Sequence, residues 1–253
     1  GINLYDQYAI IYRQGGLENH KLISQLNECF VREKLEQLPL IFDKCEHLSN
    51  KMEGELFQVY LYGKALYSSY ILNEIDQAIE YEVEGINIIC ANYNSSLDLI
   101  PLKLTNISLT LIQSLAVDLA SVSRKEEGFS YLIQLHQYLN VLLETNDYVI
   151  NRNHNFETKL YCSVIHNLIV YNTNYYTYQE LDQLCRKGLD TLKHYNLSFV
   201  FPELLFDQCN ICSHLSKEEE ANKFYLMAQQ MGDFYYNEDM RRNLECNLLD
   251  DKL

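Results

Sequence analysis

The sequence is poor in the two residues that make most turns, with 9 glycines and 3 prolines among 253 residues. Sandwiches and barrels of short β-strands need tight turns at close intervals, and glycine and proline supply many of them. The scarcity therefore argues against an all-β fold. Tryptophan is absent as well, so 21 tyrosines and 10 phenylalanines supply the aromatic surface.

Basic residues are also in short supply. The chain has 20 Lys and Arg side chains against 35 Asp and Glu, a formal net charge of −15. Such a surface repels the phosphate backbone of nucleic acids and favours cationic partners. We therefore expect this stretch of chain not to bind DNA by itself.

Long hydrophobic runs and targeting signals are missing. No segment of about 20 apolar residues could cross a bilayer, and the N-terminal residues do not show a basic region followed by an apolar core. We therefore expect a cytoplasmic protein that does not enter a membrane. Because the first residue is Gly1 and not Met, we also expect further sequence upstream of it.

The motifs of common enzymes are not found. The sequence has no glycine-rich phosphate loop, no G-x-S-x-G and no H-E-x-x-H. The acidic residues fall on faces of helices that we expect to be solvated, without a convergent pair. We predict no enzyme activity and no cofactor; a Cys–His nucleophilic pair, or an enzyme with a metal or cofactor in a helical bundle, remains the open alternative.

Eight cysteines are scattered through apolar helical patterns. Buried free thiols in a reducing compartment are the simplest explanation. Cys209 and Cys212 have the spacing of a zinc ligand pair, and His214 is close by. They lie inside a helical pattern, however, and no second cysteine pair accompanies them. We expect core packing here and no metal.

Apolar residues recur at helical spacing through long segments. In 76–86, for example, Ile79, Val83 and Ile86 form a stripe, and Ala78 and Gly85 are small enough for a neighbouring helix to come close. Similar segments follow one another in pairs, which we place at about 17–48, 53–91, 98–144, 157–195 and 202–235. The sequence therefore predicts an all-α fold.

Capping boxes support an internal repeat. In this motif a hydroxyl and a Glu three residues later satisfy the free backbone donors at a helix start. We expect three boxes, each opening the second helix of a pair: Ser123 with Glu126, Thr177 with Glu180, and Ser216 with Glu219.

The segment 62–94 resembles a tetratricopeptide repeat, most clearly over 75–81, and 218–225 is similar. The resemblance implies a right-handed superhelical array of about five degenerate helical hairpins, which we expect to form one domain over 1–253. The spacing between equivalent second helices is longer than the 34 residues of a standard repeat. We attribute the difference to extended helices and loops.

The segments 184–190, 202–205 and 217–221 resemble a narrower group, the C-terminal sensor domains of RRNPP-type bacterial transcriptional regulators. This resemblance implies that the chain binds a short signalling peptide and forms a homodimer. It also implies contact with DNA only through an N-terminal helix-turn-helix domain, which this sequence does not contain. We expect the dimer contact in the last helical pair, around Met227 and Met231.

A ligand is expected on the first helices of the pairs, because these line the concave face of such an array. Asn and Gln suit peptide recognition, since a carboxamide both donates and accepts hydrogen bonds. Lys64 could meet a ligand carboxylate and Asp207 a ligand cation. The candidates are Asn27, Lys64, Tyr67, Asn106, Gln113, His166, Asn167, Asp207 and Asn210.

Two alternatives remain open at this point. Every amphipathic helix has a polar face, so these stripes could be ordinary solvated surface. The chain could also be a protein–protein adaptor of the tetratricopeptide type, which holds the tail of a partner protein and has no link to transcription.

Overall fold

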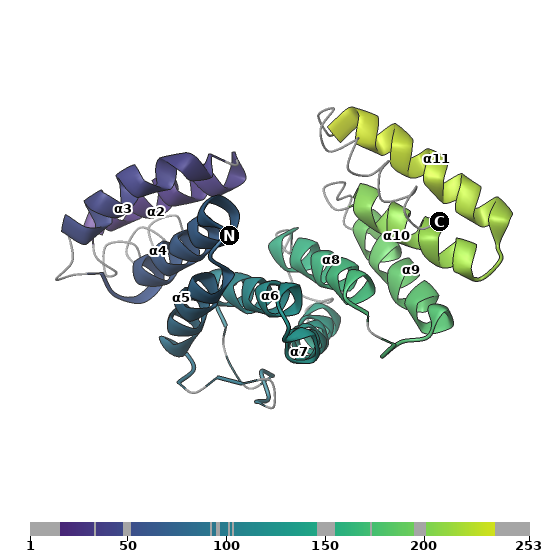
Figure 1. Cartoon of the computed structure of the whole chain (residues 1–253), viewed down its shortest axis with the longest axis horizontal. Coiled ribbons are helices and arrows are strands. Elements are labelled where there is room, and N and C mark those ends of the chain that lie inside the picture. Colours follow the sequence, from purple (N-terminus) through teal and green to yellow (C-terminus); the bar gives the residue numbers. More distant parts are fainter. Residues whose placement is uncertain are drawn as a thin grey trace. The chain divides into compact units, whose positions relative to one another are not determined.

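The computed structural model describes residues 16–32, 34–47, 52–91, 93–94, 97–100, 102, 104–145, 155–172, 174–194 and 201–235. These residues form helices joined by turns, and no strand occurs among them (Figure 1). The helices are α2 (Gly16–Val31), α3 (Leu38–His47), α4 (Gly54–Leu66), α5 (Ile75–Asn87), α6 (Asn106–Ser121), α7 (Lys125–Thr145), α8 (Asn155–Val170), α9 (Tyr178–His194), α10 (Phe201–His214) and α11 (Glu218–Tyr235).

These helices follow the predicted pairs closely. Each predicted pair contains two successive helices, from α2 with α3 to α10 with α11. One boundary was wrong, because we expected the first helix of the third pair to begin at Asp98. Helix α6 begins at Asn106, where the Thr105 hydroxyl accepts a hydrogen bond from the Ser108 amide at 3.3 Å. Asp98 instead accepts a bond from the Ile100 amide at 2.9 Å, which holds the chain in a turn.

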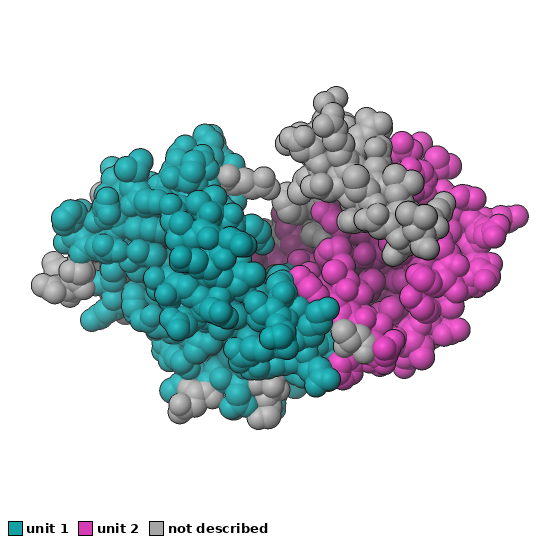
Figure 2. Space-filling view, viewed as in Figure 1, with its two compact units in different colours: residues 1–135 teal, residues 136–253 magenta. Residues whose placement is uncertain are grey.

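The chain divides into two compact units, residues 1–135 and 136–253 (Figure 2). In the first unit α4 packs against α2, α5 and α6, and α5 also packs against α6. In the second unit α9 packs against α8 and α10, and α10 against α8 and α11. Helix α7 contributes residues to both units. The expectation of one continuous domain stays a prediction.

Small residues allow close helix packing in the first unit. On α5, Ala78 is fully buried, and a Cβ added to Gly85 would lie 2.9 Å from the Leu111 side chain of α6. On α7, a Cβ on Gly128 would lie 2.4 Å from the carbonyl oxygen of Ala116. The backbones of α6 and α7 can therefore come this close only because residue 128 has no side chain.

The apolar stripe on α5 was only partly correct. Ile79 and Ile86 are buried as expected, but Val83 is 40% exposed. The neighbouring Glu82 is fully buried in its place. Its position, three residues after Ile79 and four before Ile86, puts it on the buried face of the helix. The expectation that acidic residues lie on solvated faces was therefore wrong at this position.

One of the three expected capping boxes is confirmed. The Thr177 amide donates to Glu180 Oε2 at 2.7 Å, and the Glu180 amide donates back to the Thr177 hydroxyl at 3.3 Å. The box at Ser216 was wrong, because this residue ends α10. It has a left-handed φ of 58°, and its amide donates to the Ser213 carbonyl. The box at Ser123 was also wrong, since α7 begins only at Lys125.

Two short helical segments depart from α geometry. Residues Leu35–Gln37 form a 3₁₀ turn before α3, so Pro39 stands in the first turn of that helix, where proline is tolerated. Residues Tyr67–Leu72 continue α4 as a π-helix that ends at Asn73, with a left-handed φ of 58°. π-Helices are rare, and each of their hydrogen-bonded turns contains one residue more than a turn of an α-helix.

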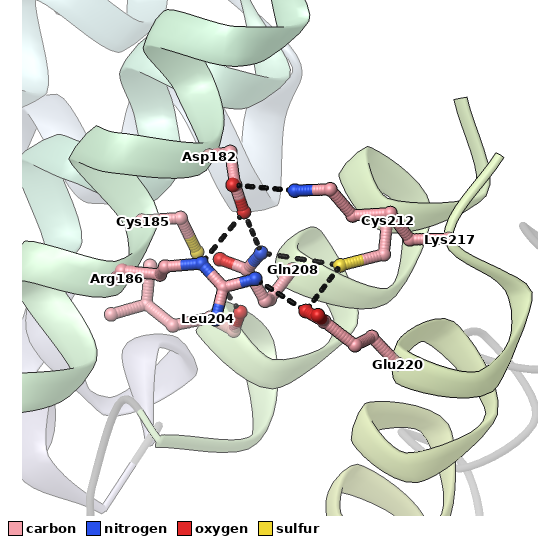
Figure 3. Close-up of polar contacts among 8 residues, drawn as sticks. All are labelled: Asp182, Cys185, Arg186, Leu204, Gln208, Cys212, Lys217 and Glu220. Atoms are coloured by element: carbon pink, nitrogen blue, oxygen red, sulfur yellow. Dashed lines mark hydrogen bonds and ion pairs between the residues drawn. The ribbon is translucent and has the colours of Figure 1, made fainter. Parts of the chain in front are cut away.

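A polar network joins the last three helices (Figure 3). Asp182 of α9 accepts hydrogen bonds from Arg186 at 2.9 Å and from Lys217 at 3.1 Å, and also one from Gln208 of α10. Arg186 extends the network by donating to Glu220 of α11 at 2.6 Å. These bonds hold the carboxylate charged, and they lower the pKa of Asp182 although its partial burial acts to raise it.

Candidate functional site

The polar face of α4 in the first unit is already engaged by α3. The Lys64 ammonium lies 3.2 Å from Glu46 Oε1 and 4.7 Å from the centre of the Phe42 ring. The Tyr60 hydroxyl donates to the same Glu46 oxygen at 2.7 Å. Both hydrogen bonds lower the pKa of Glu46, that from Tyr60 most. A ligand carboxylate at Lys64 would therefore compete with Glu46.

The other candidates in the first unit are dispersed over three helices. Tyr67 is half-buried, and its ring meets the Phe42 ring edge-on, with centroids 6.2 Å apart. Gln113 is half-buried on α6, whereas Asn27 on α2 and Asn106 at the start of α6 are exposed. Within the described part of the chain, no hydrogen bond joins Asn27 or Asn106 to another candidate. Among the described residues of this unit, Phe42 contacts both Lys64 and Tyr67 and so brings these two candidates near each other.

The second unit brings two candidates into direct contact. His166 of α8 and Asp207 of α10 lie 2.7 Å apart, between Nδ1 and Oδ2. The Asp207 side chain is 10% exposed and that of His166 is 30% exposed. Asp207 is thus placed to orient the imidazole, which keeps part of its ring accessible.

Electrostatics favour a charged His166. Burial acts to lower its pKa, but the charge and hydrogen bond of Asp207, helped by the charge of Glu203, outweigh burial and raise it. Burial also raises the pKa of Asp207, and His166 offsets part of that shift. The pair can therefore present an imidazolium whose second N–H is free of Asp207.

The two asparagine candidates of the second unit lie on the same two helices as this pair. Asn167 follows His166 on α8, and Asn210 lies three residues after Asp207 on α10. Both residues are half-buried, so each is partly accessible to a ligand. We call His166, Asn167, Asp207 and Asn210 the α8–α10 face.

The cysteines near this face pack in the core. Cys212 is fully buried and Cys209 is 6% exposed, and both contact Ala221 of α11 with Phe224 and Tyr225 around them. Burial raises the pKa of buried thiols elsewhere in the chain, to about 11 for Cys45. His214 stacks on the Tyr178 ring, with centroids 4.2 Å apart. Among the described residues, no group of three or more potential metal ligands converges.

Several polar contacts between distant residues were not found from the sequence. Glu46 binds Lys64 across a gap of 18 residues, and the Ser69 hydroxyl lies 3.3 Å from the buried Asp118 across 49. Such contacts depend on how helices stack, so no local pattern reveals them.

Among the described helices, none combines the length and apolarity needed to cross a membrane.

Comparison with solved structures identifies the fold. PlcR of Bacillus thuringiensis, in complex with the peptide PapR7 and DNA, matches with a TM-score of 0.62 and 13% identity, over 89% of this chain and 73% of that one. BtubC from P. vanneervenii matches with 0.60 and 13% identity, over 94% of both chains. Tetratricopeptide-like repeats of a putative kinesin light chain from Podosopora anserina match with 0.51 and 12% identity, over 85% of this chain and 92% of that one.

These likenesses confirm the predicted fold class, an all-α array of tetratricopeptide-like helical hairpins. No protein-family model and no curated protein sequence matches the chain. At 12–13% identity the likeness extends to the fold, and function has to be argued from the site.

Proposed function

We propose that the chain is a cytoplasmic peptide-binding module that holds a short peptide, or the tail of a partner protein, on the first helices of its hairpins. The main support is the α8–α10 face, where an imidazole oriented by a buried carboxylate lies on the same two helices as two half-buried carboxamides. Carboxamides can bond both the N–H and the C=O of an extended peptide. PlcR, which shares the fold, is in complex with a peptide.

We further propose that the module is the sensor of a transcriptional regulator. Peptide binding would favour one of two arrangements of the hairpins or of a homodimer, and so act on an attached DNA-binding domain. This requires different affinities for the two arrangements, because tight binding alone shifts nothing. In a dimer, Met227 and Met231 on α11, which are half-buried, are candidate contacts.

The second candidate function is that of an adaptor without a link to transcription. The likeness to tetratricopeptide-like repeats supports it, since stacked helical hairpins by themselves offer a concave face to the tail of a partner. The protein sequence encoded upstream of Gly1 separates the two candidates. A helix-turn-helix domain there supports the sensor, and any other sequence supports the adaptor.

The α8–α10 face is tested by replacing Asn167 and Asn210 together with Ala. We expect peptides selected from a randomised heptapeptide library to bind the double variant about tenfold more weakly, or worse, since two hydrogen bonds of about 1 kcal/mol each are lost. Isothermal titration calorimetry measures the affinity. A matched control replaces Asn87 and Asn222, which are exposed on second helices. Equal affinity of the double variant and the native chain would refute the assignment.

A further inference from the structure

The second unit contains a groove that the proposed function does not use. Its volume is about 710 Å³, within the usual range of about 300–1,000 Å³ for ligand sites. One wall is the last part of α7, with Asn140 and Glu144, and the other is α9, with Gln183 and Lys187. Tyr161 of α8 lies between them and is almost completely buried.

This groove is separate from the α8–α10 face. Tyr161 and Asn167 are six residues apart on α8, so they point about 120° away from each other around the helix axis. His166 meets Asp207 of α10, whereas the Tyr161 ring stacks on His136 of α7, with centroids 5.2 Å apart. The two sides of α8 therefore serve different surfaces.

The walls of the groove are joined through one carboxamide. Asn140 Oδ1 accepts hydrogen bonds from the Tyr161 hydroxyl at 3.4 Å and from the Lys187 ammonium, and its amide donates to Glu144 at 2.8 Å. Every one of these polar groups is at the groove surface. A ligand could therefore replace some of the hydrogen bonds within this cluster with bonds of its own.

The charge of the groove differs from that of the chain. Although the net charge of the protein is −15, the groove is formally neutral, because Arg186 and Lys187 balance Glu144 and Asp190 among its lining residues, which also include His194. Arg186 is held by Asp182 and Glu220. Lys187 donates a hydrogen bond to Asn140 Oδ1, and its ion pair with Glu144, at 3.6 Å, involves a carboxylate whose side chain is 65% exposed. A pair of this kind contributes little and exchanges easily.

We infer that the groove between α7 and α9 binds a short acidic peptide segment, with a ligand carboxylate at the Lys187 ammonium. Asn140 and the exposed Gln183 supply carboxamides for the peptide backbone. Leu143, which is half-buried, offers apolar surface to a neighbouring ligand side chain. The site is independent of the α8–α10 face and lies on second helices, where the sequence predicted no ligand.

The experiment uses the full chain and a randomised heptapeptide display library. Selected peptides are synthesised with a fluorescent label, and their dissociation constants are measured by anisotropy for the native chain, Lys187→Gln and Lys193→Gln. Lys193 is the matched control, because it is exposed on the same helix but does not line the groove. Circular dichroism verifies that each variant is folded.

We expect selection to enrich Asp or Glu in the peptides. Lys187→Gln should weaken their binding about three- to tenfold, since a partly exposed ion pair is lost, while Lys193→Gln leaves it within about twofold. The inference is overturned if no peptide is selected or if both lysine variants weaken binding equally. It is also overturned if binding depends only on Asn167 and Asn210, a result that would leave the proposed function standing. A dimer that dissociates in Lys187→Gln with unchanged peptide affinity would assign the groove to a second copy, and so would also overturn it.

Discussion

The pKa values of carboxyl groups are shifted in opposite directions in the two units. Asp182 accepts hydrogen bonds from Arg186 and Lys217, which lower its pKa. In the first unit, burial and the charge of Asp118 raise the pKa of the fully buried Glu82 well above its usual value, and the Ser114 hydroxyl offsets only part of this shift. Burial also raises the pKa of Asp118 to about 6. No cation contributes to either shift in the described part of the chain.

Glu82→Gln should therefore stabilise the protein in alkaline solution. In the unfolded chain Glu82 ionises near pH 4.5, whereas the folded protein keeps it protonated to much higher pH. The folded state binds more protons, so native stability falls as the pH rises above about 4.5. We expect the variant to gain about 1–3 kcal/mol over the native chain at pH 8 and much less at pH 5, measured by urea unfolding.

Glu80→Gln is the matched control, because Glu80 is exposed on the same helix and accepts a bond from Gln77 at 2.8 Å. Its effect should stay within about 0.5 kcal/mol and should not depend on pH. A Glu82→Gln variant that is less stable than the native chain at both pH values would show that Glu82 is ionised in the folded protein.

Residue positions were easier to predict than residue environments. The apolar stripe placed position 82 on the buried face of α5, but the acidic side chain led us to expect exposure and to choose Val83 instead. The box at Thr177 succeeded because both its members are local. The box at Ser216 failed because a hydroxyl residue can also end a helix in the left-handed conformation, and the same sequence pattern describes both cases.

At the scale of helices, close packing depends on single glycines. A Cβ on Gly128 would meet backbone atoms of α6, the Ala116 oxygen at 2.4 Å and the Ala120 nitrogen at 2.7 Å. A Cβ on Gly188 would meet only side-chain ends of Ile165 and Leu204, both at 3.2 Å. Side chains can rotate away, whereas a helix backbone has to move as a whole.

Gly128→Ala and Gly188→Ala should accordingly differ, although the chemical change is the same. We expect the first to cost about 3 kcal/mol or more, because α6 and α7 have to separate. The second should stay within about 1 kcal/mol, because better helix propensity offsets mild crowding. Thermal unfolding of the two variants, each against the native chain, decides this. Equal costs would mean that α6 and α7 adjust freely.

Helix boundaries could be predicted to within a few residues wherever the apolar period was regular. The first helix of the third pair was the exception, since apolar residues from Asp98 onward look like part of it. Thr105 ends that extension by capping α6 at Asn106. A single threonine between two apolar segments is only a weak sequence signal for the start of a helix.

At the scale of the whole molecule, helical hairpins depend mainly on their neighbours. The Asp182 network joins α9, α10 and α11 within the second unit. Asp182→Ala removes the common acceptor and leaves Arg186, Gln208 and Lys217 without it. We expect a local loss of about 2–3 kcal/mol, seen as faster amide hydrogen exchange in α9–α11 and unchanged exchange in α2–α5.

Asp190→Ala is the matched control for that measurement, because Asp190 lies on the same helix with its side chain 78% exposed. It should leave exchange rates nearly unchanged throughout. Faster exchange in α2–α5 of the Asp182 variant would contradict local coupling and would indicate that the whole chain unfolds as one cooperative unit.

The fold class could be predicted because a period of 3.6 residues and a recurring pair of segments are properties of the sequence itself. Of the predicted site residues, the structure brings His166 and Asp207 into contact. The groove between α7 and α9 is lined by none of them. That groove could not be found in advance, because Asn140 and Lys187 lie 47 residues apart and belong to no common pattern.

The π-helix over Tyr67–Leu72 implies an unusual tolerance of changes in chain length. Each of its turns holds one residue more than an α-turn, so deleting a single residue there would restore ordinary α geometry instead of breaking the helix. Deleting Tyr67 or Ser68 would nevertheless rotate the side chains that follow and separate Ser69 from the buried Asp118. The surplus residue thus keeps a hydroxyl in register with an acidic group of the core, at a point where the backbone alone would allow a shorter chain.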